Sequence, residues 1–538
     1  MKRVVVIQAR TNSARLPAKV LLPVKGIPLA VLAAKRAGNT GLEVIVATSE
    51  EASDDVLVQA LVENDIRFYR GSLNNTLDRI VNALKSYSDD TLVFRLTADN
   101  VFPDGALLEE MQSAFTEKNI EYLCCNGEKS GLPYGMSAEL TRLCHLRDAS
   151  RYTGSPYDQE HVTPFVRRQY GESYFERYKD IQKGHFRCTV DCLDDYLGIQ
   201  EVFSEVEDPI HESAFSLVDR LYKVKFQPMS RTAAKKLVLG TAQLGLFYGI
   251  NNQTGKPDAD TAERLIKSAI VNGATFIDTA RAYGDSEKVV GQALKNGWQG
   301  RTKIVTKLSP LNEGAYNSPE TISAFVDASL YKSSTLLGVQ SLDVLLLHRA
   351  SDMVDWDGAA WKRLLEHKDK GFIKKLGLSV QTPSELELAL TSHDVTFIQM
   401  PFNVLDWRWD EVIPKIIKEK EKRDLTIHVR SALLQGLLLS SSIEHWQRAN
   451  EPSAGKVISW LVDQAENYGK LSVADFCLNY VKSCAWVDGL VIGMETINQL
   501  IDNVSILSES DFSDNELNKI KEGRPYIDKN VLNPTCWS

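Results

Sequence analysis

Short apolar runs alternate with amphipathic helical patterns through the first 225 residues of the chain. Apolar positions three and four residues apart predict helices at Asp55–Glu63 and Thr76–Ser86. Apolar, largely β-branched runs predict strands at Arg3–Gln8, Glu43–Thr48, Ile66–Arg70, Thr91–Leu96 and His185–Val190. Strands that alternate with helices in this way are typical of an open α/β sheet.

The alternation becomes stricter in the second part of the chain. Apolar runs, each followed by a helical pattern, predict strands at Lys236–Gly240, Thr275–Ile277, Lys303–Lys307, Leu342–Leu347, Lys375–Ser379, Thr396–Met400, Leu425–Val429 and Gly489–Ile492. Such a series of strand–helix repeats over roughly 250 residues predicts a (β/α)8 TIM barrel. We therefore expect an α/β protein with an open sheet over 1–225, a linker at 226–234, and a barrel with a C-terminal tail over 235–538.

Composition narrows the classes of function. The 62 Lys and Arg residues are outnumbered by 71 Asp and Glu, which gives a net charge of −9 and argues against a nucleic-acid-binding surface. No apolar run approaches the roughly 20 residues that span a bilayer, so we expect no membrane association and a cytoplasmic location. The 8 cysteines form no C-x-x-C pair and no zinc-type spacing with histidine.

Four polar residues follow three neighbouring strands of the predicted barrel. Asp278 and Tyr283 follow the second strand, Lys307 ends the third, and His348 follows the fourth. Barrel enzymes carry their chemistry at these strand ends. An ammonium can stabilise a phenolate, a carboxylate can hold the ammonium, and an imidazole can orient a carbonyl that accepts hydride from a nicotinamide. Each residue alone is more simply an ion pair or a core residue, but the set predicts carbonyl reduction.

Three further segments carry a family resemblance over residues 235–508. Leu239–Gln243, Phe276–Ala280 with Tyr283 and Gly284, and Gln399–Asn403 resemble the aldo-keto reductase family. The resemblance implies NAD(P)H as cofactor and a carbonyl sugar or another small carbonyl compound as substrate. It implies that Tyr283 is the general acid, that Lys307 and Asp278 tune it, and that His348 positions the carbonyl. It also implies cofactor contacts from Ser379, Gln399, Ser431, Leu433, Gly493, Thr496, Gln499 and Asn503.

The predicted cofactor site departs from the family pattern at several positions. Arg430 stands where an aromatic residue commonly stacks on the nicotinamide. Met494 and Gln499 occupy positions that often contact the 2′-phosphate of NADP(H), and Glu495 adds a negative charge beside them. The family generally favours NADP(H), whereas this local charge would repel a phosphate dianion. The sequence leaves the choice between NAD and NADP open.

A basic loop follows the first strand of the N-terminal sheet. Gln8–Lys19 contains Arg10, Ser13, Arg15 and Lys19, which could surround phosphate oxygens, although a solvated basic turn is the alternative. The loop matches neither the G-x-G-x-x-G nor the G-x-x-x-x-G-K-[ST] pattern.

Two acids follow predicted strands of the same sheet. Asp99 comes after Thr91–Leu96, and Asp191 comes directly after His185–Val190. Alone, each aspartate is more simply a turn or helix cap. Carboxylates at strand ends can also hold Mg²⁺ while the metal binds substrate phosphates. With the basic loop, the two acids predict phosphoryl or nucleotidyl transfer.

The N-terminal half, over about residues 1–220, resembles the cytidylyltransferases that activate sugar acids, in particular the branch associated with polysaccharide and spore-coat synthesis. The segments that carry the resemblance are Gln8–Lys19, Ala47–Ser49 with Asp54 and Asp55, Arg70–Ser72, Arg95–Asp99, Gly135–Glu139 and Glu160–Thr163. The resemblance implies that Arg10, Ser13, Arg15 and Lys19 bind CTP and that Asp99 and Asp191 hold Mg²⁺. Ala98 stands where the family usually has glycine.

Together these patterns predict a bifunctional enzyme of activated surface-sugar biosynthesis. One unit would transfer a cytidylyl group from CTP to an acidic sugar of the nonulosonate or ketodeoxyoctonate type, or to a related sugar. The other would reduce a carbonyl on the same pathway, or catalyse the reverse oxidation. Two alternatives stay open: an active reductase with a regulatory nucleotide-binding domain, and a non-catalytic assembly scaffold. A homodimer is one assembly that the sequence leaves open.

Overall fold

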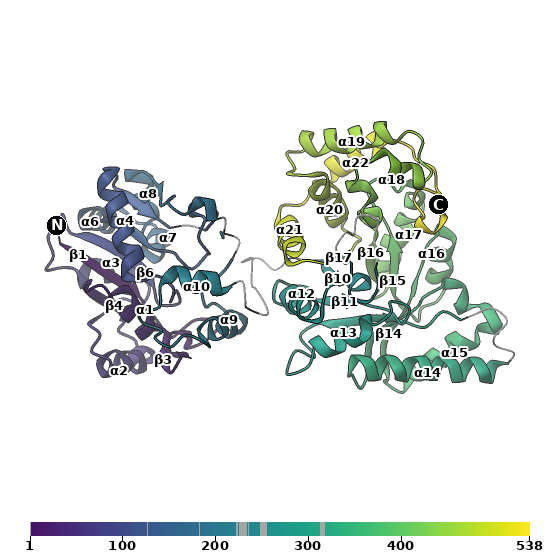
Figure 1. The fold of residues 1–538 in the computed structure, drawn as a ribbon, viewed down its shortest axis with the longest axis horizontal. Coiled ribbons are helices and arrows are strands. Elements are labelled where there is room, and N and C mark those ends of the chain that lie inside the picture. Colours follow the sequence, from purple (N-terminus) through teal and green to yellow (C-terminus); the bar gives the residue numbers. More distant parts are fainter. Residues whose placement is uncertain are drawn as a thin grey trace. The chain divides into compact units, whose positions relative to one another are not determined.

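The computed structural model describes residues 2–125, 127–181, 183–184, 186–221, 224, 234, 236–247, 255–311 and 318–537. The chain divides into two compact units, Met1–Met229 and Ser230–Ser538 (Figure 1). The linker predicted at 226–234 lies outside the described residues except for Ala234. No helix in the described part of the chain is long and apolar enough to cross a membrane.

The first unit is built on an open sheet. Within the described residues its seven strands follow the order β5 (Phe68–Gly71), β4 (Val44–Ser49), β1 (Arg3–Gln8), β6 (Leu92–Thr97), β8 (Glu139–Arg142), β7 (Tyr122–Cys124) and β9 (Ser173–Tyr174). The first four strands in this order are parallel. Strand β8 runs antiparallel to both of its neighbours, and β2 (Pro23–Val24) and β3 (Ile27–Pro28) form a separate hairpin. The predicted open α/β sheet is confirmed, with an antiparallel extension that periodicity did not indicate.

Helices cover both faces of this sheet (Figure 1). Val5 and Ile7 pack with apolar residues of one helical layer, whereas Val4 and Val6 pack with those of the other. Because both faces are buried, β1 is a continuous apolar run. The helices are α1 (Leu29–Ala37), α2 (Asp55–Glu63), α3 (Thr76–Ala83), α4 (Gly105–Glu117), α5 (Gly127–Ser130), α6 (Leu143–Tyr152), α7 (Pro156–His161), α8 (Pro164–Tyr170), α9 (Leu193–Phe203) and α10 (Ala214–Arg220).

The strand predicted at His185–Val190 is wrong. His185 lies outside the described residues, and the rest of the segment forms only isolated bridges, Tyr134 with Arg187 and Asn100 with Thr189. The bridge to Asn100 brings the segment alongside the end of β6, and the Val190 N–H donates to the Asp99 carbonyl at 3.0 Å. This pairing brings the segment that contains Asp191 next to the one that contains Asp99.

The second unit is a closed parallel barrel, so the predicted TIM barrel is confirmed. Among the described residues its eight strands are β10 (Leu237–Gly240), β11 (Phe276–Asp278), β12 (Lys303–Lys307), β13 (Leu342–Leu347), β14 (Ile373–Ser379), β15 (Val395–Pro401), β16 (Thr426–Arg430) and β17 (Gly489–Gly493). Strand β17 closes the barrel on β10, where Gly493 pairs with Gly240. In a parallel barrel all C-terminal strand ends open on one mouth.

Helices follow the barrel strands and surround them (Figure 1). They are α11 (Ala242–Gly245), α12 (Ala259–Val271), α13 (Ser286–Ala293), α14 (Pro319–Leu337), α15 (Ala359–Asp369), α16 (Pro383–Leu390), α17 (Ile413–Lys422), α18 (Ile443–Arg448), α19 (Ala454–Asn467), α20 (Val473–Ser483) and α21 (Ile497–Ser508). A further helix, α22 (Asp514–Gly523), precedes a C-terminal segment that returns to the barrel, where the Trp407 indole N–H donates to the Ile527 carbonyl at 2.9 Å.

Two candidate active sites

A buried ion pair lies at the mouth of the barrel. Lys307, at the end of β12, is 1% exposed, and its Nζ donates to both carboxylate oxygens of Asp278 at 2.8 and 3.0 Å. The same nitrogen lies 4.9 Å from the centroid of the Tyr283 ring. The Tyr283 and His348 rings meet edge to face with centroids 6.1 Å apart. Folding therefore gathers all four residues of the predicted reduction site.

The electrostatics of this group keep Lys307 charged and His348 neutral. Burial disfavours the Lys307 ammonium, but Asp278 and Tyr283 outweigh it and raise the Lys307 pKa. Burial first, and then the charges of Lys307, Arg430 and Arg349, lower the pKa of His348 to about 4. At neutral pH the site thus holds an ammonium beside the phenol and a neutral imidazole that can donate one N–H. The His348 Nδ1 has no hydrogen-bond partner among the described residues.

A cavity of about 900 Å³ opens beside Tyr283 and His348. Most of the cofactor residues predicted from the sequence line it, namely Ser379, Ser431, Leu433, Gly493, Gln499 and Asn503. Gln399 and Thr496 are not among the lining residues. Gln399 is fully buried and its Nε2 donates to Asp278 Oδ1 at 2.7 Å, whereas Thr496 is the N-cap of α21.

Several lining residues have no counterpart among the residues predicted from the sequence. Gln243 lies so close to Gly493 that a Cβ added there would be 2.1 Å from its Nε2, so a larger residue at that strand end would displace the Gln243 side chain. Arg349 follows His348, and the tail residues Asn533–Thr535 also line the cavity. The Gln381 Nε2 donates to Asn533 Oδ1 at 3.1 Å and so joins the tail to the end of β14. Arg349 directly follows a predicted site residue, but nothing in the sequence indicated the return of the tail.

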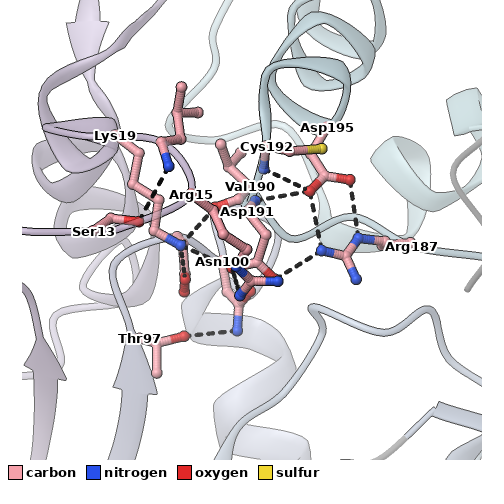
Figure 2. Close-up of polar contacts among 12 residues, drawn as sticks. Ser13, Arg15, Lys19, Thr97, Asn100, Arg187, Val190, Asp191, Cys192 and Asp195 are labelled. Atoms are coloured by element: carbon pink, nitrogen blue, oxygen red, sulfur yellow. Dashed lines mark hydrogen bonds and ion pairs between the residues drawn. The ribbon is translucent and has the colours of Figure 1, made fainter. Parts of the chain in front are cut away.

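In the N-terminal unit, one lysine bridges the two predicted metal ligands. The Lys19 Nζ donates to Asp99 Oδ2 at 2.6 Å, to Asp191 Oδ1 at 2.9 Å and to the Val190 carbonyl at 2.8 Å (Figure 2). Burial disfavours the Lys19 ammonium, yet Asp99 and Asp191 outweigh burial and raise the Lys19 pKa. The basic loop and both strand-end acids therefore meet at one place.

Asp191 is held by further cations. Arg15 lies 2.9 Å from Asp191 Oδ1, and Arg187 Nη2 donates to Asp191 Oδ2 at 2.7 Å (Figure 2). Burial alone would raise the Asp191 pKa, but Lys19, Arg187 and Arg15 together lower it. Arg187 is itself fixed by Asp195 at the start of α9. Arg187 and Asp195 were missed from the sequence, although their spacing of four residues on either side of Asp191 could have indicated them.

The other two predicted nucleotide ligands lie apart from these contacts. Arg10 is 44% exposed and lies 3.6 Å from Glu160 in α7. Ser13 accepts a hydrogen bond from the Leu16 N–H at 3.4 Å within the loop (Figure 2). The loop is anchored instead at Thr11, whose backbone N–H and hydroxyl both donate to the buried Asp54 at 2.8 and 2.7 Å. Asp54 belongs to one of the segments that carry the cytidylyltransferase resemblance, but the sequence did not indicate that it holds this loop.

The donor chemistry of this cluster suits a hard cation. Mg²⁺ in proteins is commonly bound by one or two carboxylates together with substrate phosphates. Asp99 and Asp191 present carboxylate oxygens to one point, which the Lys19 ammonium now fills, so a metal ion bound there would have to displace it. The described residues contain no cluster of three or more metal-ligating side chains, so the remaining ligands would come from substrate and water. Arg15, whose side chain is 66% exposed, lies beside these carboxylates and is paired with Asp191.

Comparison with known proteins agrees with both geometries. Residues 236–524 match the model of the aldo/keto reductase family. The chain belongs to the aldo/keto reductase family. Residues 4–204 of this aldo/keto reductase match the cytidylyltransferase model, so its N-terminal unit is a cytidylyltransferase domain. Both units are enzyme domains. The families imply NAD(P)H and a carbonyl substrate for the barrel, and CTP with a sugar-like substrate for the N-terminal unit.

Individual relatives cover one unit each. The spore coat polysaccharide biosynthesis protein SpsF of Bacillus subtilis is 29% identical over 226 residues, which are 40% of this chain and 92% of SpsF. The uncharacterized oxidoreductase YqkF of B. subtilis is 23% identical over 303 residues, 53% of this chain and 95% of YqkF. The holo form of the aldo-keto reductase AKR11C1 from Bacillus halodurans is 20% identical, covers 55% of this chain and 95% of that one, and has a TM-score of 0.44.

Proposed function

We propose that the barrel reduces a carbonyl compound with Tyr283 as the proton donor. The arrangement that carries the proposal is the buried Lys307–Asp278 pair beside the Tyr283 ring, with neutral His348 across from it. When bound, the coenzyme supplies the hydride that joins the carbonyl carbon. The Tyr283 hydroxyl gives its proton to the carbonyl oxygen, and the alcohol leaves. The Lys307 ammonium stabilises the phenolate, and His348 orients the oxygen through an N–H.

We propose that the nicotinamide of the coenzyme lies beside Tyr283 and His348. Ser431, Leu433 and residues of α21 line the same cavity, and we place the adenosine end near Gly493 and Asn503. Ser379 would contact the carboxamide, Thr496 would frame the adenosine end through the cap it forms, and Gln399 would hold Asp278 in place.

We propose that the N-terminal unit transfers a cytidylyl group from CTP to an acidic sugar of the nonulosonate or ketodeoxyoctonate type. A sugar oxygen attacks the α-phosphorus, and the bond to pyrophosphate breaks. The convergence of Arg15 and Lys19 on Asp191 supports this step, because the two cations can neutralise phosphate charge. Asp99 and Asp191 would hold Mg²⁺, which when bound adds further positive charge at the phosphates.

Because the two domains share one chain, we propose that they act on the same surface-sugar pathway. Acidic sugars are screened for CTP-dependent pyrophosphate release, with and without NADH or NADPH. The variant Tyr283→Phe should abolish carbonyl reduction and spare pyrophosphate release, and Asp99→Ala should do the reverse. Loss of both activities in a folded variant of either kind would overturn the two-site proposal. Measurable CTP binding without any pyrophosphate release would favour a regulatory N-terminal domain instead.

A further inference from the structure

The charged side chains that line the barrel cavity are distributed unevenly. Among the described residues only two lining side chains are basic, Arg349 and Arg430. Besides Asp278, the acidic lining residues are Glu385, Asp475, Glu495, Asp502 and Glu509. The segments 248–254 and 312–317, which lie outside the described residues, contain no lysine or arginine. A phosphate bound away from the two arginines would therefore meet carboxylates rather than cations.

Both arginines lie near the catalytic residues. Arg349 follows His348 in the chain and lies 3.1 Å from Asp352 Oδ1. Arg430 ends β16 and donates to the Val380 carbonyl at 3.2 Å and to Gln381 Oε1 at 2.8 Å. Their positive charges help to lower the pKa of His348. Under the proposed function this is the nicotinamide end, where NADH and NADPH are identical.

The start of α21 also lines the cavity, through Glu495 and Gln499, and under the proposed function it is the adenosine end. The Gln499 Oε1 accepts from the backbone N–H groups of Glu495 and Thr496 at 2.7 and 3.2 Å, and the Gln499 N–H donates to the Thr496 hydroxyl at 3.2 Å. This reciprocal cap uses three of the N–H donors that could otherwise bind a phosphate at a helix start. The cap also carries the carboxylate of Glu495.

The lysines packed against this end are already paired with acids. Lys470 lies 2.8 Å from Glu509 Oε2 and 3.9 Å from Asp475 Oδ1. Lys482 donates to the Glu509 carbonyl at 2.8 Å and lies 3.3 Å from Asp511. Neither lysine lines the cavity. The net charge that faces a ligand here is consequently negative.

We propose that this reductase selects NADH over NADPH, an inference that rests on the proposed function of the barrel. A 2′-phosphate at the α21 end would bring about two negative charges towards Glu495 and Asp502 without a cation to offset them. The free 2′-hydroxyl of NADH can instead donate a hydrogen bond to a carboxylate, the interaction by which acidic residues recognise the NAD ribose in other folds. The acidic end of the cavity therefore distinguishes the two coenzymes in two ways, by repelling the 2′-phosphate of NADPH and by accepting a hydrogen bond from the 2′-hydroxyl of NADH.

The test measures coenzyme binding to the full chain, independently of any carbonyl substrate. All 9 tryptophans lie between Trp298 and Trp537, so quenching of their fluorescence reports on the barrel unit. NADH should bind at least about tenfold more tightly than NADPH, and raising the salt concentration should narrow this gap because repulsion is screened. Equal or tighter binding of NADPH would overturn the proposal. Binding of neither coenzyme would overturn the proposed reductase function itself.

A charge-reversal variant sharpens the test. Glu495→Arg should raise the affinity for NADPH relative to NADH by about tenfold or more, because a repulsive carboxylate becomes a phosphate ligand. The matched control is Glu387→Arg, which changes a half-exposed acid on α16 that pairs with Lys415 and does not line the cavity. An unchanged ratio in Glu495→Arg, in a protein that still binds NADH, would show that the α21 end does not set the preference.

Discussion

The Lys19 ammonium lies 2.6 Å from a carboxylate oxygen of Asp99, and it also holds Asp191. One side chain therefore occupies the place between the two carboxylates that a divalent cation would need. We expect the free protein to bind such a cation weakly, and CTP to strengthen binding because its phosphates draw Lys19 away from the acids.

The variant Lys19→Met should free both carboxylates for metal. Mn²⁺ would then bind without CTP, with an affinity at least about tenfold above that of the unmodified chain, because an opposing cation is gone. The loss of free-ion signal in electron paramagnetic resonance measures binding. Lys25→Met is the control, because Lys25 Nζ donates to the Ser204 carbonyl at 3.2 Å and pairs with no carboxylate among the described residues. Tight Mn²⁺ binding by the unmodified chain without CTP would contradict this expectation.

The variant Lys307→Met should abolish carbonyl reduction and destabilise the barrel. Removing the ammonium leaves the buried Asp278 carboxylate without its cation, which costs about 3–5 kcal/mol. Urea unfolding followed by tryptophan fluorescence measures the loss. The double variant Lys307→Met with Asp278→Asn should regain most of the stability but none of the activity. Full activity in either variant would remove Lys307 from the proposed mechanism.

Acid should destabilise the barrel through two histidines. Burial first, and then nearby positive charge, lowers the pKa of His428 to about 3, and His348 is lowered to about 4 in the same way. The unfolded chain takes up protons near pH 6.5 whereas the folded barrel does not, so stability falls as pH decreases from about 6.5 to about 4, by about 1.4 kcal/mol per pH unit for each histidine.

The variant His428→Leu should reduce this pH slope. The centroid of the His428 ring lies 4.7 Å from that of Phe276 and 4.5 Å from that of Phe397. Neither nitrogen of His428 has a hydrogen-bond partner among the described residues, so an apolar side chain suits the site. Urea unfolding at several pH values measures the slope, with the exposed His393→Leu as control. A slope identical to that of the unmodified chain would show that His428 is charged when folded.

The variant Asp54→Asn should weaken CTP use by loosening the basic loop. The Asp54 carboxylate accepts hydrogen bonds from Thr11, Thr48 and Ser49, which hold its pKa low against the opposing effect of burial. We expect KM for CTP to rise by about tenfold while carbonyl reduction is unchanged. Pyrophosphate release measures the effect, and Asp55→Asn is the control because the Asp55 side chain is 61% exposed. A fall in kcat alone would contradict a positioning role.

The barrel could be predicted from the sequence because parallel strands buried on both faces leave continuous apolar runs. The residues at the mouth of the barrel could also be predicted, because Asp278 and Lys307 are the last residues of neighbouring strands. The extension of the first sheet by β8, β7 and β9 could not be predicted, because strands of 4, 3 and 2 residues are too short for a periodic pattern. The contact between Thr189 and Asn100 depends on distant chain pairing that local propensity does not encode.

Side-chain partners were harder to foresee than backbone elements. Gln399 stands at a predicted cofactor position, yet its amide faces Asp278 inside the barrel. Asp195 and Asp54 act by holding Arg187 and Thr11, which only the folded chain places within reach. The contact of Asp54 with Thr11 follows no spacing rule because it joins two separate elements, whereas Arg187 and Asp195 lie four residues on either side of Asp191.

The return of Asn533–Thr535 to the cavity has a practical consequence for handling this protein. These residues form part of the wall of the proposed coenzyme cavity, and Gln381 ties them to the barrel. If the coenzyme binds in this cavity, a purification tag at the C-terminal end of the chain would slow or distort its exchange. Tags and immobilisation linkers therefore belong at the opposite terminus when turnover is to be assayed.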